Sequence, residues 1–130
     1  MKNILLVFLF LSSSAFAADA RLNKLFSAIA KVESGNNPKA LNAKENAIGI
    51  YQIRPAYFLD SRIKGKHSDV YNVNVAREVC EAYFKRYAPE AYKNADFETL
   101  ARLHNSGPAY SKRKHLTNGY WQKVKKNLDN

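Results

Sequence analysis

The chain has 130 residues, and its 21 lysines and arginines outnumber its 11 aspartates and glutamates by ten. This length suits one domain, and a hydrophobic share of 46% is too high for a disordered polycation. The single cysteine cannot close a disulfide within the chain, which excludes a small fold stapled by disulfides.

The first residues predict an export leader. A positively charged start precedes an unbroken apolar run over residues 4–11, and residues 15–17 form an A-x-A cleavage signal. The run is too short for a membrane span, which needs about 20 apolar residues. We therefore expect a signal peptide over residues 1–17, with cleavage after residue 20 as the alternative. The remaining domain, residues 18–130, would be periplasmic or secreted.

Helical periodicity dominates the rest of the chain. The expected helices cover residues 20–34, 55–62, 72–88, 96–107 and 117–128. Residues 36–53 look irregular and contain an apolar run that is either a strand or a bent loop, and residues 62–71 and 109–116 look like polar or basic loops. This pattern predicts an all-α or α-dominated single domain, in which a minor short β-hairpin is allowed.

Cys80 falls on the apolar face of the third expected helix. A buried structural thiol is the expected state for a cysteine in this position, and an intermolecular disulfide is the alternative. An exported domain of this size would then be stabilised by packing, since it can form no disulfide within the chain.

Glu33 is the residue whose position suggests chemistry. It lies at the end of the first expected helix, one turn after Ile29 and beside Val32, and therefore at the edge of the apolar face. Partial burial and the negative end of the helix dipole both raise the pKa of a carboxyl there. A carboxylic acid that keeps its proton near neutral pH can act as a general acid. From position alone, an ordinary surface glutamate is the alternative.

Three sequence blocks resemble the lytic transglycosylase family of the lysozyme-like superfamily. In the first block, residues 33–35 read Glu-Ser-Gly, and residues 49–52 read Gly-Ile-Tyr-Gln, which is similar to the family's Gly-Leu-Met-Gln. In the second block, residues 103–108 read Leu-His-Asn-Ser-Gly-Pro, which is similar to the family's Ala-Tyr-Asn-Ala-Gly-Pro. Tyr120 and Val124 match a third block. The blocks follow the family's order and imply a lysozyme-like fold.

The resemblance implies a role for each matching residue. Glu33 would be the catalytic acid and then the base, and Ser34 would orient its carboxyl by a hydrogen bond. Asn105 would line the cleft opposite Glu33, and Tyr120 would reach the catalytic carboxyl or the sugar. For Ser34, Asn105 and Tyr120 the alternative is a turn or packing role.

Three further positions complete the expected site. Gln52 would hold substrate, and Tyr51, which replaces the family's Met, would form a bulkier wall of the groove. For Gln52 and Tyr51 too, a turn or packing role is the alternative. His104 stands where the family has Tyr, and it would either add a titrating group beside the cleft or simply fill that space.

The implied reaction is cleavage of the β-1,4 bond between MurNAc and GlcNAc in peptidoglycan. Such enzymes often use two carboxylates, but the other acidic residues sit in no motif and read as solvated or ion-paired, so we expect one catalytic glutamate. The resemblance favours a lytic transglycosylase that forms 1,6-anhydromuramyl ends, and a lysozyme that hydrolyses the same bond is the alternative. No cofactor or metal site is expected, because the three histidines lack ligand spacing.

Positive charge gathers near the C-terminus, at residues 112–115 and 123–126, with aromatic residues between. We expect a monomer whose partners are peptidoglycan strands and not nucleic acid, with peripheral electrostatic contact to an anionic wall or membrane surface. A non-catalytic, cationic wall-binding protein is the alternative of another class.

Overall fold

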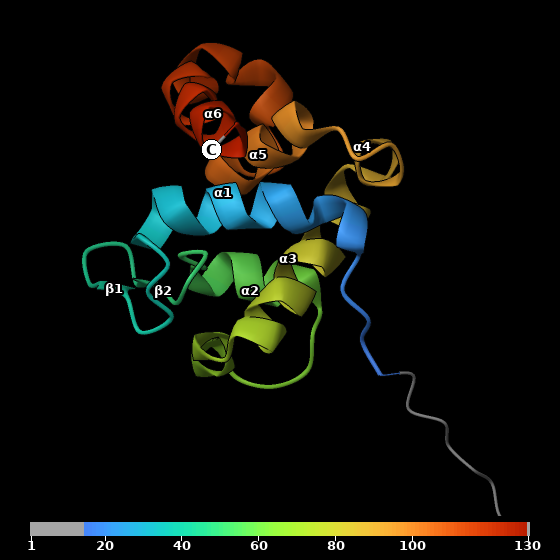
Figure 1. Ribbon diagram of the computed structural model, residues 1–130. Coiled ribbons are helices and arrows are strands. Elements are labelled where there is room, and N and C mark those ends of the chain that lie inside the picture. Colours follow the sequence, from blue (N-terminus) through green and yellow to red (C-terminus); the bar gives the residue numbers. More distant parts are fainter. Residues whose placement is uncertain (1–14, 130) are drawn as a thin grey trace, which may run out of the picture.

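The computed structural model describes residues 15–129. The predicted leader lies outside the described residues except for its last three positions. Figure 1 shows one helix, α1 (Asn23–Ser34), crossing the centre of the molecule. On one side of it lie α5 (Phe97–Ser106) and α6 (Lys114–Leu128), and on the other lie α2 (Pro55–Ser61) and α3 (Val73–Tyr87). Within residues 15–129, no helix combines the length and the apolar character that a membrane crossing needs.

Short and long helices follow one another along the chain, and one small β-hairpin interrupts them. In chain order they are η1 (Ala20–Leu22), α1 (Asn23–Ser34), β1 (Leu41–Asn42), β2 (Ala47–Ile48), α2 (Pro55–Ser61), η2 (His67–Tyr71), α3 (Val73–Tyr87), α4 (Pro89–Lys93), α5 (Phe97–Ser106), η3 (Tyr110–Lys112) and α6 (Lys114–Leu128), where η marks a 3₁₀ helix. Strands β1 and β2 pair antiparallel, with Leu41 opposite Ile48. The α-dominated prediction is confirmed, including the short hairpin.

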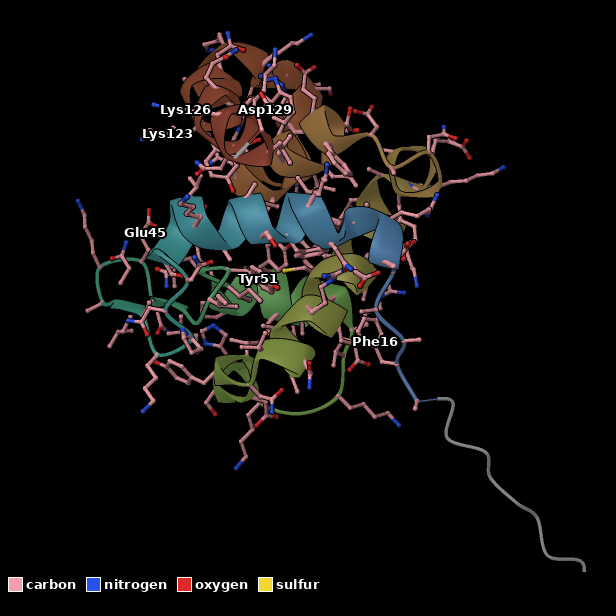
Figure 2. All side chains as sticks on the ribbon, viewed as in Figure 1. Phe16, Glu45, Tyr51, Lys123, Lys126 and Asp129 are labelled. Atoms are coloured by element: carbon pink, nitrogen blue, oxygen red, sulfur yellow. The ribbon has the colours of Figure 1, made fainter. Side chains whose placement is uncertain are left out.

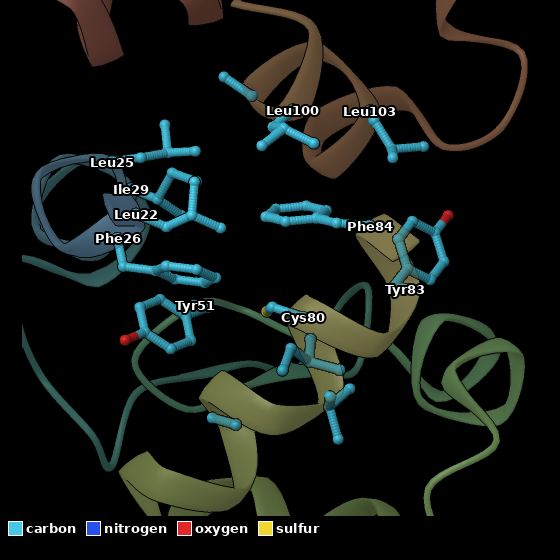
Figure 3. Close-up of a cluster of buried hydrophobic side chains, with 14 of the residues drawn as sticks. Leu22, Leu25, Phe26, Ile29, Tyr51, Cys80, Tyr83, Phe84, Leu100 and Leu103 are labelled. Atoms are coloured by element: carbon cyan, nitrogen blue, oxygen red, sulfur yellow. The ribbon is translucent and has the colours of Figure 1, made fainter. Parts of the chain in front are cut away.

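The core lies between α1 and the helices on both sides of it (Figure 3). The fully buried side chains of α1 recur at three- and four-residue steps and face Phe84 of α3 and Leu100 and Leu103 of α5. Burying each such large apolar side chain contributes about 1.5–3 kcal/mol. Cys80 is a free thiol buried in this core, as the sequence predicted. The packing holds α1 in place and thereby fixes the position of its last turn.

Two predicted helix starts are confirmed by their caps. Asn72 Oδ1 accepts the backbone N–H groups of Asn74 and Val75 at 2.9 and 3.1 Å and begins α3. Asp96 Oδ1 accepts the N–H of Thr99 at 3.2 Å and begins α5. These side chains satisfy donors that the first helical turn leaves free.

Three predicted boundaries are wrong. Helix α6 begins at Lys114 and not at residue 117, because Thr117 is an interior residue: it is buried and its hydroxyl accepts Arg102 Nη1 at 2.8 Å. Pro89, expected only to follow a helix, is the first residue of α4, where a proline needs no N–H partner. The expected loop at 62–71 contains η2, and His67 Nε2 donates there to the Ile53 carbonyl at 2.7 Å.

Gly49 sits where the chain turns after β2 and presses against η2. Its φ is +81°, and a Cβ built there would lie 2.7 Å from the Val70 carbonyl oxygen. We expect Gly49→Ala to lower the free energy of unfolding by about 2–3 kcal/mol, through left-handed strain and overlap.

Gly119 is the matched control, because it lies within α6 and a Cβ there meets nothing within 4 Å. We expect Gly119→Ala to stabilise the protein by about 0.5–1 kcal/mol. Urea unfolding of both variants checks the pair, and equal effects would contradict the contact at Val70.

Candidate active site

A cavity of about 200 Å³ opens where the end of α1 meets α2, α3 and the end of α5. Its lining combines two carboxyl groups, one guanidinium, two side-chain amides and two tyrosines. The lining residues are Glu33, Gln52, Arg54, Ala56, Tyr57, Asp60, Tyr83, His104, Asn105, Ser106, Gly107 and Pro108. The three sequence blocks singled out above therefore contribute unequally. The first supplies Glu33 and Gln52 to the lining and the second supplies residues 104–108. The third supplies Tyr120, which approaches Glu33 from α6.

Glu33 is half-buried in the last turn of α1, which ends at Gly35 in the left-handed conformation. Burial raises the pKa of the Glu33 carboxyl to about 7, and the negative charge of Glu45 adds to this. The Tyr120 hydroxyl and the Arg54 charge act in the opposite direction and lower it. The raised pKa predicted from the sequence is confirmed, so a proton is available on this carboxyl near neutral pH.

Tyr120 points its hydroxyl toward the same carboxyl. Its oxygen is buried and has no hydrogen-bond partner of good geometry among the described residues. The pair is thus a near contact and not a formed hydrogen bond, although the hydroxyl is close enough to lower the pKa of Glu33. A buried donor that lacks a partner is costly, and a small shift of either side chain would join it to Glu33.

His104 connects three parts of the site. Its Nε2 lies 2.9 Å from the Tyr51 carbonyl oxygen, and its Nδ1 lies 2.9 Å from the Tyr57 hydroxyl. The carbonyl can only accept, so Nε2 carries the proton and Nδ1 accepts from Tyr57. Burial lowers the pKa of His104 to about 4. His104 therefore stays neutral at physiological pH and fixes α5 to α2 and to the segment that carries Gln52.

The two predicted amides both line the cavity with Glu33. Gln52 adopts a left-handed backbone, with φ of +52°, and its Nε2 donates to the Gly49 carbonyl at 3.0 Å, which leaves its amide oxygen without a described partner. Asn105 is half-buried and its side chain makes no hydrogen bond within residues 15–129. Both amides can thus offer polar atoms to a ligand.

Two predicted residues lie elsewhere. The ring of Tyr51, expected as a wall of the groove, is 5% exposed and packs edge-on against Phe26, with 5.1 Å between ring centroids. Ser34, expected to orient the Glu33 carboxyl, directs its hydroxyl 2.7 Å from the Ile50 carbonyl oxygen and accepts the Asn37 N–H at 3.1 Å. Ser34 ties the end of α1 to the segment after the hairpin.

Several lining residues were not predicted from the sequence. Tyr57 stacks on Tyr83 with 3.7 Å between ring centroids and forms an aromatic wall. Arg54 stands two residues after Gln52, and this closeness to a predicted site residue is the sequence signal that could have pointed to Arg54. Asp60 also lines the cavity and lies 4.0 Å from Arg86.

Glu45 is a second acidic residue that bears on the site. It lies in the turn between β1 and β2, beside the C-terminal end of α1 (Figure 2), and its charge reaches Glu33. Sequence alone gave both Glu45 and Asp60 a solvated or ion-paired role. Within residues 15–129, no three histidine, cysteine or acidic side chains gather as a metal site would require.

Residues 23–127, which include α1 and all the helices around the cavity, match the sequence profile of the destabilase family. The chain belongs to the destabilase family. It is 27% identical over 117 residues to Lysozyme 1 of Crassostrea virginica, an alignment that covers 87% of this chain and 63% of that protein. The destabilase-family chain thus spans less than two thirds of the length of this curated relative.

A solved chain supports the fold of this destabilase-family member. It comes from the crystal structure of Aeromonas hydrophila PliI in complex with Meretrix lusoria lysozyme, with 32% identity, a TM-score of 0.69, and coverage of 85% of this chain and 93% of that one. The lysozyme-like fold is therefore shown. The resemblance to lytic transglycosylases holds at the level of lysozyme-like proteins and does not extend to that family.

Proposed function

We propose that this destabilase-family chain is a lysozyme that hydrolyses the β-1,4 bond between MurNAc and GlcNAc in peptidoglycan. The observation that carries the proposal is Glu33, a half-buried carboxyl with a pKa of about 7 that lines the cavity. The similarity to a protein named Lysozyme 1 supports hydrolysis over the transglycosylase outcome that the sequence blocks favoured.

In this mechanism the protonated Glu33 donates its proton to the oxygen of the bond that breaks. The resulting carboxylate then activates a water molecule, which attacks the sugar carbon. A second group must stabilise the positive charge that develops on the sugar. On the protein the candidates are Glu45, whose charge reaches Glu33, and Asp60, which lines the cavity, and the N-acetyl group of the substrate is the alternative.

The shape of the cavity suits part of a polymer. Its volume of about 200 Å³ lies below the roughly 300–1,000 Å³ of sites that enclose a whole small ligand. The stacked rings of Tyr57 and Tyr83 offer an apolar wall, and Gln52 and Asn105 offer polar groups. A glycan strand would place one bond at Glu33 and continue across the open surface.

A cell-wall clearing assay tests whether the chain is an enzyme. A catalyst present at one part per thousand of sugar units continues to lower the turbidity of a peptidoglycan suspension until the substrate is consumed. A wall-binding protein instead stops once its sites are saturated. Saturation without release of soluble fragments would contradict the proposal.

The pH profile gives a second test. Activity should fall above pH 7, because the general acid must carry its proton and its pKa is about 7. The Glu45 charge raises that pKa, so Glu45→Gln should move the alkaline limb to lower pH, by roughly half a unit. Lys44→Gln, on the same turn, is the control. A limb that moves upward in Glu45→Gln would contradict the assignment.

We also propose that the domain is exported, because residues 1–17 resemble a signal peptide. We further propose that its basic surface holds it near an anionic wall. Residues 99–128 contain seven lysines and arginines and no acidic residue. Most of these cations lie on η3 and α6, where Lys123 is exposed (Figure 2). Clearing of whole walls should weaken with salt more than cleavage of short soluble strands.

A further inference from the structure

Arg54 is the sole cationic side chain in the described lining of the active-site cavity. It is exposed, and its guanidinium makes no hydrogen bond or ion pair with any residue from 15 to 129. Four of the other six arginines are held by carboxylate or carbonyl oxygens; these are Arg21, Arg77, Arg86 and Arg102. The remaining two, Arg62 and Arg113, lie outside the cavity lining. An unpaired guanidinium that lines a cavity is a group available to an anionic ligand.

The backbone of Arg54 is firmly placed. The preceding residue, Ile53, exchanges two backbone hydrogen bonds with Ile48, at 2.9 and 3.1 Å. Arg54 itself is extended, with φ of −85° and ψ of 160°, and its carbonyl accepts the Phe58 N–H at 3.1 Å. The Arg54 side chain therefore extends from a fixed backbone position at the N-terminal end of α2.

The charge of Arg54 is felt by three groups of the cavity. It lowers the pKa values of Glu33, His104 and Tyr83, although burial is the largest influence on each of the three. These groups come from α1, α5 and α3, so the guanidinium lies within electrostatic reach of three sides of the cavity. Glu33 and Asp60 are the acidic groups of the same lining, and an anionic ligand would need this cation beside them.

The proposed substrate contains such an anion on alternate sugars. GlcNAc is uncharged, whereas the lactyl ether of MurNAc ends in a carboxylate when it is free, and carries a stem peptide with further carboxylates when it is substituted. We propose that Arg54 binds a carboxylate of the muramyl unit and thereby selects muramyl strands over uncharged GlcNAc polymers. This inference rests on the proposed function and adds the specificity-determining residue. A guanidinium can take both carboxylate oxygens at once.

Dissociation constants measured by calorimetry test the inference, with Glu33→Gln as the background so that ligands bind without being cleaved. The probes are chitohexaose, glycan strands freed of stem peptides by an amidase, and strands that keep their stems. Adding Arg54→Gln should weaken binding of the carboxylate-bearing strands about tenfold more than binding of chitohexaose. Arg54→Lys should fall between, because the ammonium keeps the charge and loses the fork.

Arg62→Gln is the matched control, since Arg62 is exposed at the end of α2, outside the cavity, and its loss changes net charge equally. A selective loss with the stripped strands identifies the lactyl carboxylate, and a loss confined to stem-bearing strands identifies a peptide carboxylate. Equal weakening for all three probes overturns the inference. Arg54 would then influence the site only by lowering the pKa of Glu33. Absence of cleavage by the unmodified protein would contradict the proposed function, while this binding comparison would still be decisive for Arg54.

Discussion

Replacing Glu33 with glutamine is expected to lower the rate of peptidoglycan cleavage by about 10²–10⁴-fold or more, because an amide cannot donate the proton that the departing oxygen needs. The cavity should keep its shape, since Gln matches Glu in size and Glu33 is only half-buried. Rates of fragment release from purified peptidoglycan measure the effect, and Glu90→Gln on the short helix α4 is the matched control. Clearing by Glu33→Gln at the unmodified rate would contradict the role of Glu33.

The same variant should be more stable than the unmodified protein at alkaline pH. The pKa of Glu33 is raised from 4.5 to about 7 in the folded chain. Between these values the folded state keeps a proton that the unfolded state has lost, so stability falls as pH rises through this window and is level above it. Glu33→Gln removes this fall and should gain on the order of 2 kcal/mol at pH 8, allowing for partial solvent screening. Equal stability of both proteins at pH 8 would argue against the raised pKa.

Replacing Glu81 with alanine is expected to lower the free energy of unfolding by about 3–5 kcal/mol, the range for removing one partner of a buried ion pair. Glu81 is 1% exposed and accepts Arg77 Nε at 2.9 Å and the Tyr92 hydroxyl at 2.7 Å. The Arg77 guanidinium lies 3.9 Å from the centre of the Phe26 ring and donates to the Asp19 carbonyl. Without Glu81, this cation would remain in the core with its charge uncompensated.

A paired substitution separates the ion pair from packing. Replacing Arg77 and Glu81 together, with methionine and leucine, should recover most of the lost stability, because no unpaired charge then remains. Urea unfolding of the single and double variants measures the difference. A double variant as unstable as Glu81→Ala would show that the loss comes from packing. Hydrogen exchange at Asp19 should accelerate in Glu81→Ala, since the Asp19 N–H lies 3.3 Å from both carboxylate oxygens of Glu81.

Local signals in the sequence were enough to predict the helices that carry their own caps and apolar faces. Asn72 and Asp96 each accept backbone N–H groups within three residues, and such a contact can be read from the chain alone. The start of α6 could not, because Thr117 owes its interior position to Arg102, fifteen residues away on α5. A residue of a type that often caps helices can thus lie inside a helix when a distant residue satisfies its side chain.

The sequence likewise predicted only part of the candidate site. The position and raised pKa of Glu33 follow from the end of one amphipathic helix, and both were foreseen. For Tyr51 the sequence left a groove wall and a packing role open and could not decide between them, because its burial depends on Phe26 across the core. Arg54, Tyr57 and Tyr83 belong to no sequence motif, and only the packing of α2 against α3 brings them beside Glu33. The aromatic wall and the free guanidinium are thus products of tertiary structure.

Mass spectrometry of the fragments released from peptidoglycan in water labelled with heavy oxygen tests the central claim most directly. Hydrolysis by Glu33 predicts muropeptides with reducing ends, each carrying one labelled oxygen, and about 10²–10⁴-fold less of them from Glu33→Gln. Fragments with 1,6-anhydromuramyl ends and no label would show a transglycosylase instead. Such fragments, or the absence of any release, would contradict the assignment of this chain as a lysozyme.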